Sequence, residues 1–362
     1  MKKSQSPKRS NSINKLLFYS SLGSKGFIRR WISLITGFDQ VSNELLFDEE
    51  FYLSNNPDVK ASGMPPLKHY FLFGRFEGRK PNENEQYMCY PPGHFYSPVV
   101  NVEEIRQWEQ EIWDKKSVEE LPGIELNIDY QFHLINEFSK FYKEIPFQEE
   151  KVNSFRYYFQ NPAFSFSDGI ILYSFIRHFR PSKIIEVGSG FSSALILDTL
   201  DQITHTDVDV TFIEPYAYLL NALLSDKDKG QVVIIEKKLQ QINLSFFNKL
   251  NKDDILFIDS SHVVKTGSDV NYLLLNILPS LNKGVIIHFH DIFHPFEYPK
   301  NWVFEGRNWN EAYFLRSFLM FNTSFEIMLF PDFIHKNHKE WFSNMPNCYK
   351  NSGGSFWIRK VI

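Results

Sequence analysis

The chain has 362 residues, of which 43% are hydrophobic, 17% aromatic and 23% charged. These fractions are typical of a folded globular protein and exclude a wholly disordered or collagen-like chain. The formal net charge of −4 is unevenly distributed, because residues 1–40 hold eight Lys and Arg residues against one acidic residue. The body is therefore acidic, which argues against nucleic acid as a partner.

Neither a membrane span nor a secretory leader is predicted. The chain has no stretch of eighteen uncharged residues, whereas a spanning helix needs about 20 mostly apolar residues. The apolar residues of the N-terminus are interrupted by Lys25, Arg29 and Arg30, unlike the core of a signal peptide. Cys89 and Cys348 lack CxxC spacing, which fits a reducing compartment. We therefore expect a cytoplasmic protein.

Residues 1–40 form a basic arm. Residues 1–12 are polar and basic, a composition typical of disorder. Residues 13–36 mix Leu, Ile, Phe and Trp with basic residues. One interpretation is a broken amphipathic helix that contacts anionic lipid at the inner face of the membrane. The alternative is a tail, or a helix packed on the body, and both remain open.

Residues 41–85 are predicted to form a small helical module, because turn signals around Pro57 and Pro66 separate short segments of helical apolar spacing. The run FDEEFYLSNNPDVKASGMPPLKHYFLFGRFEGRKPN resembles a short module attached to bacterial glycosyltransferases and other surface-polysaccharide enzymes. That resemblance implies a glycan-related context and no catalytic role. Residues 86–126, rich in Pro and Tyr at their start, are expected to be a linker.

Residues 127–362 are expected to form the catalytic domain, with a helical lead-in as far as residue 180. Apolar strands then alternate with helices, which predicts a buried parallel sheet. The predicted strands are 184–188, 210–215, 231–236, 254–260 and 284–291, with helices from 192, over 217–225 and over 269–280. Two more strands, 325–330 and 354–361, alternate more strongly and are expected to be antiparallel. The expected fold class is α/β, a Rossmann-like, doubly wound, mostly parallel seven-stranded sheet.

A glycine turn, IIEVGSGFSS, follows the first predicted strand. Gly188 and Gly190 permit backbone conformations, and a close ligand approach, that a Cβ atom would block. Glu214 ends the second strand, where a carboxylate can accept hydrogen bonds from both hydroxyls of a ribose. The pattern therefore predicts a nucleoside-containing ligand.

The ligand at this turn is predicted from three features. Ser193 stands where a dinucleotide site usually has its third glycine, which disfavours NAD. No GK[ST] follows, so a P-loop is excluded. Glu186, just before the glycines, suits a sulfonium better than a pyrophosphate. These features favour S-adenosyl-L-methionine.

From about residue 160 to 360 the chain resembles a bacterial branch of the class I S-adenosylmethionine-dependent methyltransferases. The resemblance rests on the run EVGSGFSS…IEP…DILFIDSSHVVKTGSDV…LPSLNKGVIIHFHDIFHPFEYP…W. It implies that the EVGSG loop and the acid after the second strand bind the methyl donor. In this chain that role falls on Glu186, Gly188, Ser189, Gly190 and Glu214. Ser192 stands where the broader class often has a third glycine.

The reacting groups are expected at the carboxyl ends of the fourth and fifth strands. One alternative is a divalent metal, Mg²⁺, held by Asp259 and Asp291 with His290 or His262 as a further ligand. The second is direct general-base catalysis by His290 or His262, and the third is a purely structural cluster. Two further histidines are expected in the packed core and on the loop surface, respectively: His288 and His294.

The insertion after the fifth strand, residues 294–318, has residue types that stack on sugar rings and bind hydroxyls: Glu297, Tyr298, Trp302, Arg307, Trp309 and Glu311. It is either an acceptor-side lid or a packed aromatic loop. The leading hypothesis is an O-methyltransferase that acts on a sugar hydroxyl of a cell-surface glycan or glycolipid intermediate. The alternatives are a non-catalytic glycan-binding or scaffold module and an NAD-type oxidoreductase.

Overall fold

The computed structural model describes residues 47–74, 77, 79–83, 92–113, 119–203 and 207–362. The chain divides into two compact units, Met1–Cys89 and Tyr90–Ile362. The basic arm of residues 1–40, and with it the predicted lipid-contacting helix, lies outside the described residues. Within the described part, no helix is long and apolar enough to cross a membrane.

The first unit is helical, as the turn signals predict. It contains α4 (Glu49–Asn55), α5 (Pro57–Ser62) and α6 (Pro66–His69), which continues into the π-helical turn η1 (Tyr70–Gly74). The Asp48 side chain caps α4 by accepting a hydrogen bond from the Phe51 amide at 2.8 Å. The buried Tyr52 hydroxyl lies 3.0 Å from His69 Nδ1. A Cβ atom on Gly74 would come within 2.0 Å of that hydroxyl, so a larger residue there would have to displace the Tyr52 side chain.

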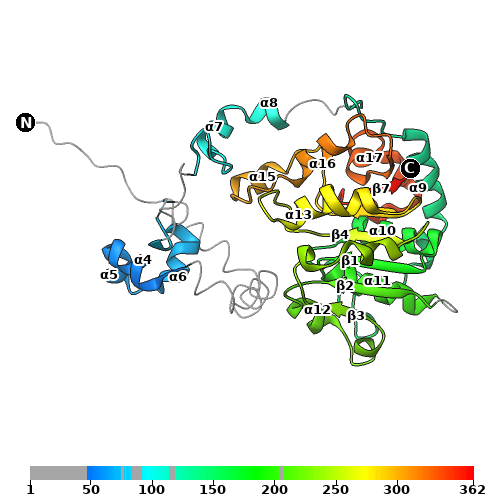
Figure 1. Cartoon of the computed structure of the whole chain (residues 1–362), viewed down its shortest axis with the longest axis horizontal. Helices are drawn as coiled ribbons and strands as arrows, with labels where there is room; N and C mark the ends of the chain where they lie inside the picture. Colours follow the sequence, from blue (N-terminus) through cyan, green and yellow to red (C-terminus); the bar gives the residue numbers. More distant parts are fainter. Residues whose placement is uncertain (1–46, 75–76, 78, 84–91, 114–118, 204–206) are drawn as a thin grey trace, which may run out of the picture. The chain divides into compact units, whose positions relative to one another are not determined.

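The second unit is built on one seven-stranded sheet with the order β3-β2-β1-β4-β5-β7-β6 (Figure 1). The strands are β1 (Lys183–Val187), β2 (Asp209–Ile213), β3 (Val233–Ile235), β4 (Ile255–Ile258), β5 (Ile286–Phe289), β6 (Phe325–Leu329) and β7 (Phe356–Lys360). The first five are parallel, and β7 runs antiparallel to both β5 and β6. This order and these directions confirm the predicted fold class and the antiparallel final pair. The central strands β1, β4 and β5 are buried almost throughout, as in a sheet covered on both faces.

Helices connect the strands and cover the sheet. They are α9 (Ile128–Ser139), α10 (Phe166–Phe179), α11 (Phe191–Gln202), α12 (Tyr218–Leu223), α13 (Asp269–Tyr272), α14 (Leu278–Ser280), α15 (Lys300–Phe304), α16 (Glu311–Leu319) and α17 (Pro331–Asn337). The single helix predicted over 269–280 contains a π-helical turn, η7 (Leu273–Ile277), between α13 and α14. Short 3-10 turns are η3 (Tyr142–Glu144), η4 (Asp228–Gly230), η5 (Leu239–Gln241), η6 (Leu244–Lys249), η8 (Lys339–Asn344) and η9 (Pro346–Tyr349).

The segment 86–126, predicted as a linker, contributes structure to the second unit. It forms α7 (Val102–Gln107) and α8 (Glu109–Trp113). Asn101 caps α7 by accepting hydrogen bonds from the amides of Glu103 and Glu104. The Trp113 indole then donates a 2.9 Å hydrogen bond to the carbonyl of Tyr298, which lies in the insertion after β5. This contact joins two segments that are distant in sequence.

The strand order places the switch point of the sheet between β1 and β4. After β1 the chain moves outward through β2 and β3, and it then returns to the other side of β1 to form β4. Loops leave the carboxyl ends of β1 and β4 in opposite directions at such a point, which opens a crevice for a ligand. The loop after β1 and the residues after β4 and β5 therefore lie at the position where a site is expected.

Candidate active site

The loop after β1 is held tightly against the end of β4. Gly188 has φ +86°, and a Cβ atom there would lie 2.1 Å from the carbonyl oxygen of Asp259. The predicted need for glycine is therefore confirmed at Gly188. Gly190 differs, because its φ of 173° is extended and a Cβ atom would meet only Leu219 Cδ2, at 3.5 Å. The protein itself leaves space open at Gly190, as a ligand-facing position requires.

Glu186 faces the start of α11 and not the open end of the crevice. Its side chain is fully buried, and its two carboxylate oxygens accept hydrogen bonds from the Ser192 and Ser193 hydroxyls at 2.5 and 2.6 Å. Burial raises the pKa of this carboxyl to about 8, although both serine bonds oppose the shift. The direct contact of Glu186 with a cationic ligand stays a prediction, and in the protein alone both of its oxygens are engaged by these serines. Glu186 therefore contacts the start of α11, directly after the glycine loop, through Ser192 and Ser193.

Glu214 and Ser189 come together at the carboxyl ends of β2 and β1. Glu214 Oε1 accepts a hydrogen bond from the Tyr216 amide at 2.8 Å, and the Ser189 hydroxyl lies 3.5 Å from Oε2. Burial raises the pKa of Glu214. The arrangement keeps one carboxylate oxygen only weakly engaged beside the glycine loop, so it can accept further hydrogen bonds from a ligand.

Asp259, His262 and Asp291 converge beyond the ends of β4 and β5. His262 Nε2 lies 3.2 Å from Asp259 Oδ1 and 3.7 Å from Asp291 Oδ2. Each of the three residues offers one potential metal-ligand atom, and these three atoms all lie within 4.8 Å of one another. His262 and Asp291 both have positive φ, 58° and 59°, a strained conformation for residues other than glycine.

A buried carboxylate fixes the ring of His262. Glu311, at the first position of α16, is 1% exposed, and its Oε2 lies 2.8 Å from His262 Nδ1. The Ser260 hydroxyl donates to the same carboxylate at 3.0 and 3.1 Å. Burial opposes the charge on His262, but hydrogen bonds to Asp259 and Glu311 outweigh it and raise the pKa of the ring well above its ordinary value. Nε2 is thereby directed at the two aspartates.

His288, in β5, and His290, directly after β5, have different surroundings. His290 lies at the edge of the cluster, with Nε2 3.6 Å from Asp291 Oδ1. Burial lowers its pKa, but the nearby charges of Asp291 and Asp259 reverse that effect and raise it. His288 is fully buried and stacks on Phe257 with ring centroids 3.8 Å apart, so the prediction of a packed histidine is confirmed.

Comparison with known proteins gives two sequence matches. Residues 185–292, which run from β1 to just past β5, match a family model described as a methyltransferase domain. An uncharacterized protein of Archaeoglobus fulgidus is 32% identical over 170 residues, which is 46% of this chain and 76% of that protein. The chain belongs to the same family as this archaeal protein.

Residues 185–292 of the chain therefore carry a methyltransferase domain.

Solved structures show weaker similarity. A methyltransferase of Podospora anserina bound to S-adenosylhomocysteine is 13% identical, covers 72% of this chain and 95% of its own, and has a TM-score of 0.36. The O-methyltransferase TomG of Streptomyces achromogenes, in complex with S-adenosylmethionine, is 12% identical, covers 72% and 96%, and has a TM-score of 0.36. Similarity at this level does not extend the activities of these proteins to this chain.

The methyltransferase domain has a support behind Asp291 that the sequence did not reveal. Asp168, near the start of α10, is buried and accepts hydrogen bonds from the amides of Gly354 and Ser355 at 3.0 Å and from the Ser355 hydroxyl at 2.5 Å. A Cβ atom on Gly354 would lie 2.9 Å from Asp291 Oδ1. The loop before β7 is thus held between Asp168 and the site. An acid in the first turn of a helix gives no sequence signal for such a role.

The insertion after β5 packs directly on the site. The Trp309 ring lies 4.3 Å from the His262 ring, centroid to centroid. The Arg307 guanidinium lies over Trp302 at 4.0 Å and over Trp309 at 5.1 Å. Five of the six sugar-binding candidates predicted in the insertion line a pocket, namely Glu297, Tyr298, Trp302, Arg307 and Trp309. Glu311 does not line it, because it is buried beneath His262.

The prediction that His294 lies on the loop surface is wrong. It is 1% exposed, and its ring packs against Phe330 and Phe333 with centroids 5.7 and 5.1 Å away. Its backbone amide also donates to Asp332 at 2.8 Å. The sequence shows a polar residue in a loop, but α17 covers that loop in the fold.

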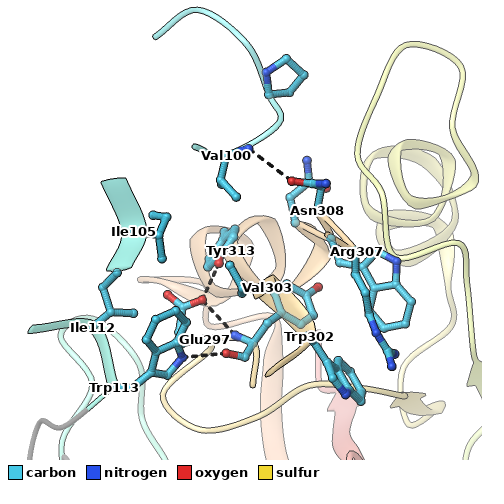
Figure 2. A pocket seen from close by; sticks show the side chains of 14 residues that line it. Val100, Ile105, Ile112, Trp113, Glu297, Trp302, Val303, Arg307, Asn308 and Tyr313 are labelled. Carbon is cyan, nitrogen blue, oxygen red and sulfur yellow. Dashed lines mark hydrogen bonds between the residues drawn. The ribbon is translucent and has the colours of Figure 1, made fainter. Parts of the chain in front are cut away.

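A pocket lies between the insertion and the segment that carries α7 and α8 (Figure 2). Its walls include Trp302, Arg307 and Trp309, together with Trp113 and Tyr313, which the sequence analysis did not single out as a site. Trp113 lies about 180 residues before this insertion in the chain, so no local pattern could have placed it there. Only the packing of α8 against the insertion brings it to the pocket.

Proposed function

We propose that this chain transfers the methyl group of S-adenosyl-L-methionine to a sugar hydroxyl of a glycan or glycolipid intermediate. The observation that carries this proposal is the position of the Asp259–His262–Asp291 cluster. It lies across the switch point from a glycine loop and a ribose-type carboxylate, within a methyltransferase domain. Donor and acceptor groups would therefore meet at the carboxyl edge of the sheet.

The donor side is supported by the loop after β1 and by Glu214. The open space at Gly190 allows a ligand to approach the backbone, and Glu214 has a weakly engaged oxygen for the ribose hydroxyls. An NAD-type ligand is less suited, because Ser193 replaces the third glycine and its hydroxyl is already used by Glu186 and by the Gly190 amide. A non-catalytic module is also disfavoured, because the acids and histidines do converge.

Methyl transfer forms a carbon–oxygen bond while the carbon–sulfur bond of the donor breaks, and the hydroxyl proton must leave the acceptor. His262 is a poor direct base at neutral pH, because the hydrogen bonds to Asp259 and Glu311 favour its charged form. Asp259 stays ionised more readily: burial raises its pKa, but the hydrogen bond from His262 lowers it below the ordinary value. Asp259 therefore suits the role of a cation ligand, because a carboxylate with so low a pKa is charged but is a weak base.

The cluster also fits a divalent cation. Glu311 holds Nδ1 of His262 and directs Nε2 toward two carboxylates, the arrangement usual around metal-binding histidines. Asp259, Asp291 and His262 would hold the ion, and when bound it would lower the pKa of the acceptor hydroxyl. Mg²⁺ prefers oxygen ligands, whereas an imidazole also suits ions such as Zn²⁺. His290 lies to one side of this set.

The sugar acceptor is supported by two features. Residues 47–82 resemble a module of surface-polysaccharide enzymes, and the pocket beside the cluster is lined by tryptophan, tyrosine and charged side chains. Aromatic faces with a few polar groups at their rim are suited to sugar rings. The basic arm would hold the protein near anionic lipid, where lipid-linked glycans are found.

The proposal is tested by calorimetric titration of S-adenosylhomocysteine into the full chain. We expect binding that Glu214→Ala weakens roughly 10- to 100-fold, because a charged hydrogen bond contributes about 1.5–3 kcal/mol. Glu326→Ala, which removes a strand carboxylate at the far edge of the sheet, is the matched control and should bind normally. Repeating the titration after EDTA treatment, and with Mg²⁺, Mn²⁺ or Zn²⁺ returned, tests the cation.

Two outcomes separate the parts of the proposal. A folded wild-type chain that does not bind S-adenosylhomocysteine would overturn the methyltransferase function. Normal donor binding in Asp259→Asn, combined with unimpaired methyl transfer to an accepted sugar, would instead show that the cluster is not the reacting centre.

A further inference from the structure

We propose that the pocket beside the reacting cluster binds a second sugar ring, next to the ring that receives the methyl group. This inference rests on the proposed function and adds the substrate class: a glycan of at least two rings rather than a free monosaccharide. The pocket is built from two segments. One is the insertion after β5, and the other is residues 98–113, which we call the strap.

The strap is fastened to the insertion along its length. The Val100 amide donates to Asn308 Oδ1 at 3.2 Å, and at the other end the Trp113 indole donates to the Tyr298 carbonyl at 2.9 Å. Between them, Glu109 pairs with Lys300 at 3.0 Å. The two hydrogen bonds, from Val100 and from Trp113, are drawn as dashed lines in Figure 2. The strap lines the pocket with apolar side chains, namely Pro98, Val100, Ile105, Ile112 and Trp113.

The pocket adjoins the reacting cluster through Trp309. This residue lines the pocket, and its ring also contacts His262 with centroids 4.3 Å apart. Tyr298 lies beside it, with ring centroids 6.1 Å apart, and its hydroxyl is held by the Ala312 amide at 3.0 Å. A ring bound in the pocket is thus separated from His262 by one aromatic side chain. A linked ring could extend past it to Asp259 and Asp291.

Two polar groups on the pocket wall favour a sugar over an alkyl chain or a phenyl ring. Glu297 Oε1 accepts hydrogen bonds from the Tyr298 amide at 2.9 Å and the Tyr313 hydroxyl at 2.5 Å. Arg307 binds Glu305 through Nε and Nη2. Within the described chain, no hydrogen bond is found to Glu297 Oε2 or from Arg307 Nη1. One acceptor and one donor on a wall that is mostly aliphatic and aromatic match hydroxyls, which both donate and accept.

The test uses the full chain saturated with S-adenosylhomocysteine and applied to an array of immobilised mono-, di- and trisaccharides. Alkyl and phenyl spacers without sugar serve as blanks. We expect binding to a subset of the di- and trisaccharides, at least about tenfold tighter than to their component monosaccharides. Val303→Trp, which fills the pocket from α15, and Trp113→Ala, which removes a wall, should each weaken that binding roughly tenfold or more.

Trp108→Ala is the matched control, because Trp108 lies on the same strap, is 56% exposed and does not line the pocket. It should bind as the wild type does. Trp113→Phe keeps the aromatic wall but loses the hydrogen bond to Tyr298, so it separates wall contact from strap attachment. If Trp113→Phe binds normally while Trp113→Ala does not, the wall itself carries the binding.

The inference is overturned by saccharide binding that survives Val303→Trp, which would place the glycan elsewhere, including on residues 47–82. It is also overturned by preference for the spacers, or by a wild-type chain that binds S-adenosylhomocysteine but no saccharide. The last result leaves the methyl-donor site intact. Loss of S-adenosylhomocysteine binding itself counts against the proposed function instead.

Discussion

At the scale of single residues, burial assigns different roles to carboxylates that look alike in the sequence. Glu186 and Glu214 both follow an apolar strand run, yet Glu186 is enclosed by two serine hydroxyls while Glu214 reaches the crevice. Glu311 stands in the first turn of a helix, where acidic residues usually face solvent, but it is buried and holds His262. The difference lies in which neighbours satisfy each oxygen and in how much water remains.

The pKa of Glu186 predicts a pH-dependent stability. Burial raises this pKa from 4.5 to about 8, so the folded state keeps a proton that the unfolded state releases between those values. Stability of the wild type should therefore fall as pH rises from about 4.5 to 8. Glu186→Gln is neutral throughout and should lose this dependence, with an advantage over wild type that grows toward pH 8 to on the order of 3–5 kcal/mol.

Urea unfolding of both proteins at several pH values between 5 and 8 measures the effect. Glu340→Gln, at an exposed position of η8, serves as the control and should follow the wild type. Parallel curves for wild type and Glu186→Gln would show that Glu186 is ionised in the folded protein.

At the scale of elements, the loop before β7 connects a buried helix start to the site. Gly353 packs against the Asp168 carboxylate, and Gly354 packs against Asp291. The carbonyl of Gly354 also accepts the Ile292 amide at 2.9 Å. Because Asp291 has a strained positive φ, its position depends on this loop, on α10 and on β5 together.

Gly353→Ala is expected to destabilise this loop by more than the strain of placing alanine at a positive φ. Gly353 has φ +69°, and a Cβ atom would lie 2.4 Å from Asp168 Oδ1, whereas Gly267 has φ +72° and nothing within 4 Å. Gly267→Ala therefore has the same backbone strain without the clash. We expect Gly353→Ala to lose about 1–3 kcal/mol more unfolding free energy than Gly267→Ala, measured by urea denaturation.

The same pair tests the connection to the site. Methyl transfer should fall in Gly353→Ala while affinity for S-adenosylhomocysteine stays normal, because the donor loop lies on the other side of the switch point. Equal stability and equal activity of the two alanine variants would show that Asp168 can move aside without consequence.

At the scale of the whole molecule, charge is separated along the chain. The eight basic residues of the first forty oppose an acidic remainder. Each basic residue near an anionic membrane contributes about 1 kcal/mol, and this attraction weakens as salt screens it. The arm is therefore a membrane-contacting segment in our hypothesis, independent of the catalytic domain.

Sedimentation with vesicles checks that hypothesis. The full chain should bind vesicles that contain phosphatidylserine, and binding should fall steeply between about 0.1 and 0.5 M salt. Phosphatidylcholine vesicles should retain little protein. A chain that lacks residues 1–40 should lose the binding but keep its affinity for S-adenosylhomocysteine. Equal binding by the shortened chain would refute a role for the arm.

The sequence by itself determined the sheet, its strand directions and the glycine loop. Apolar runs such as 254–260 and 284–291 indicate buried parallel strands because local patterning and burial coincide there. All seven predicted strands are present, with ends within two residues of the prediction. The need for glycine at position 188 could be predicted for the same reason, since a turn directly after a strand has a local steric requirement.

Only the tertiary structure decided how polar side chains are used. It turned Glu186 toward α11, buried Glu311 under His262, covered His294 with α17, and brought Asp168 and Trp113 to the site from outside its motifs. Each of these outcomes depends on which distant element packs against the residue. Sequence periodicity records whether a residue is apolar, but a polar residue's partners are set by contacts that have no local pattern.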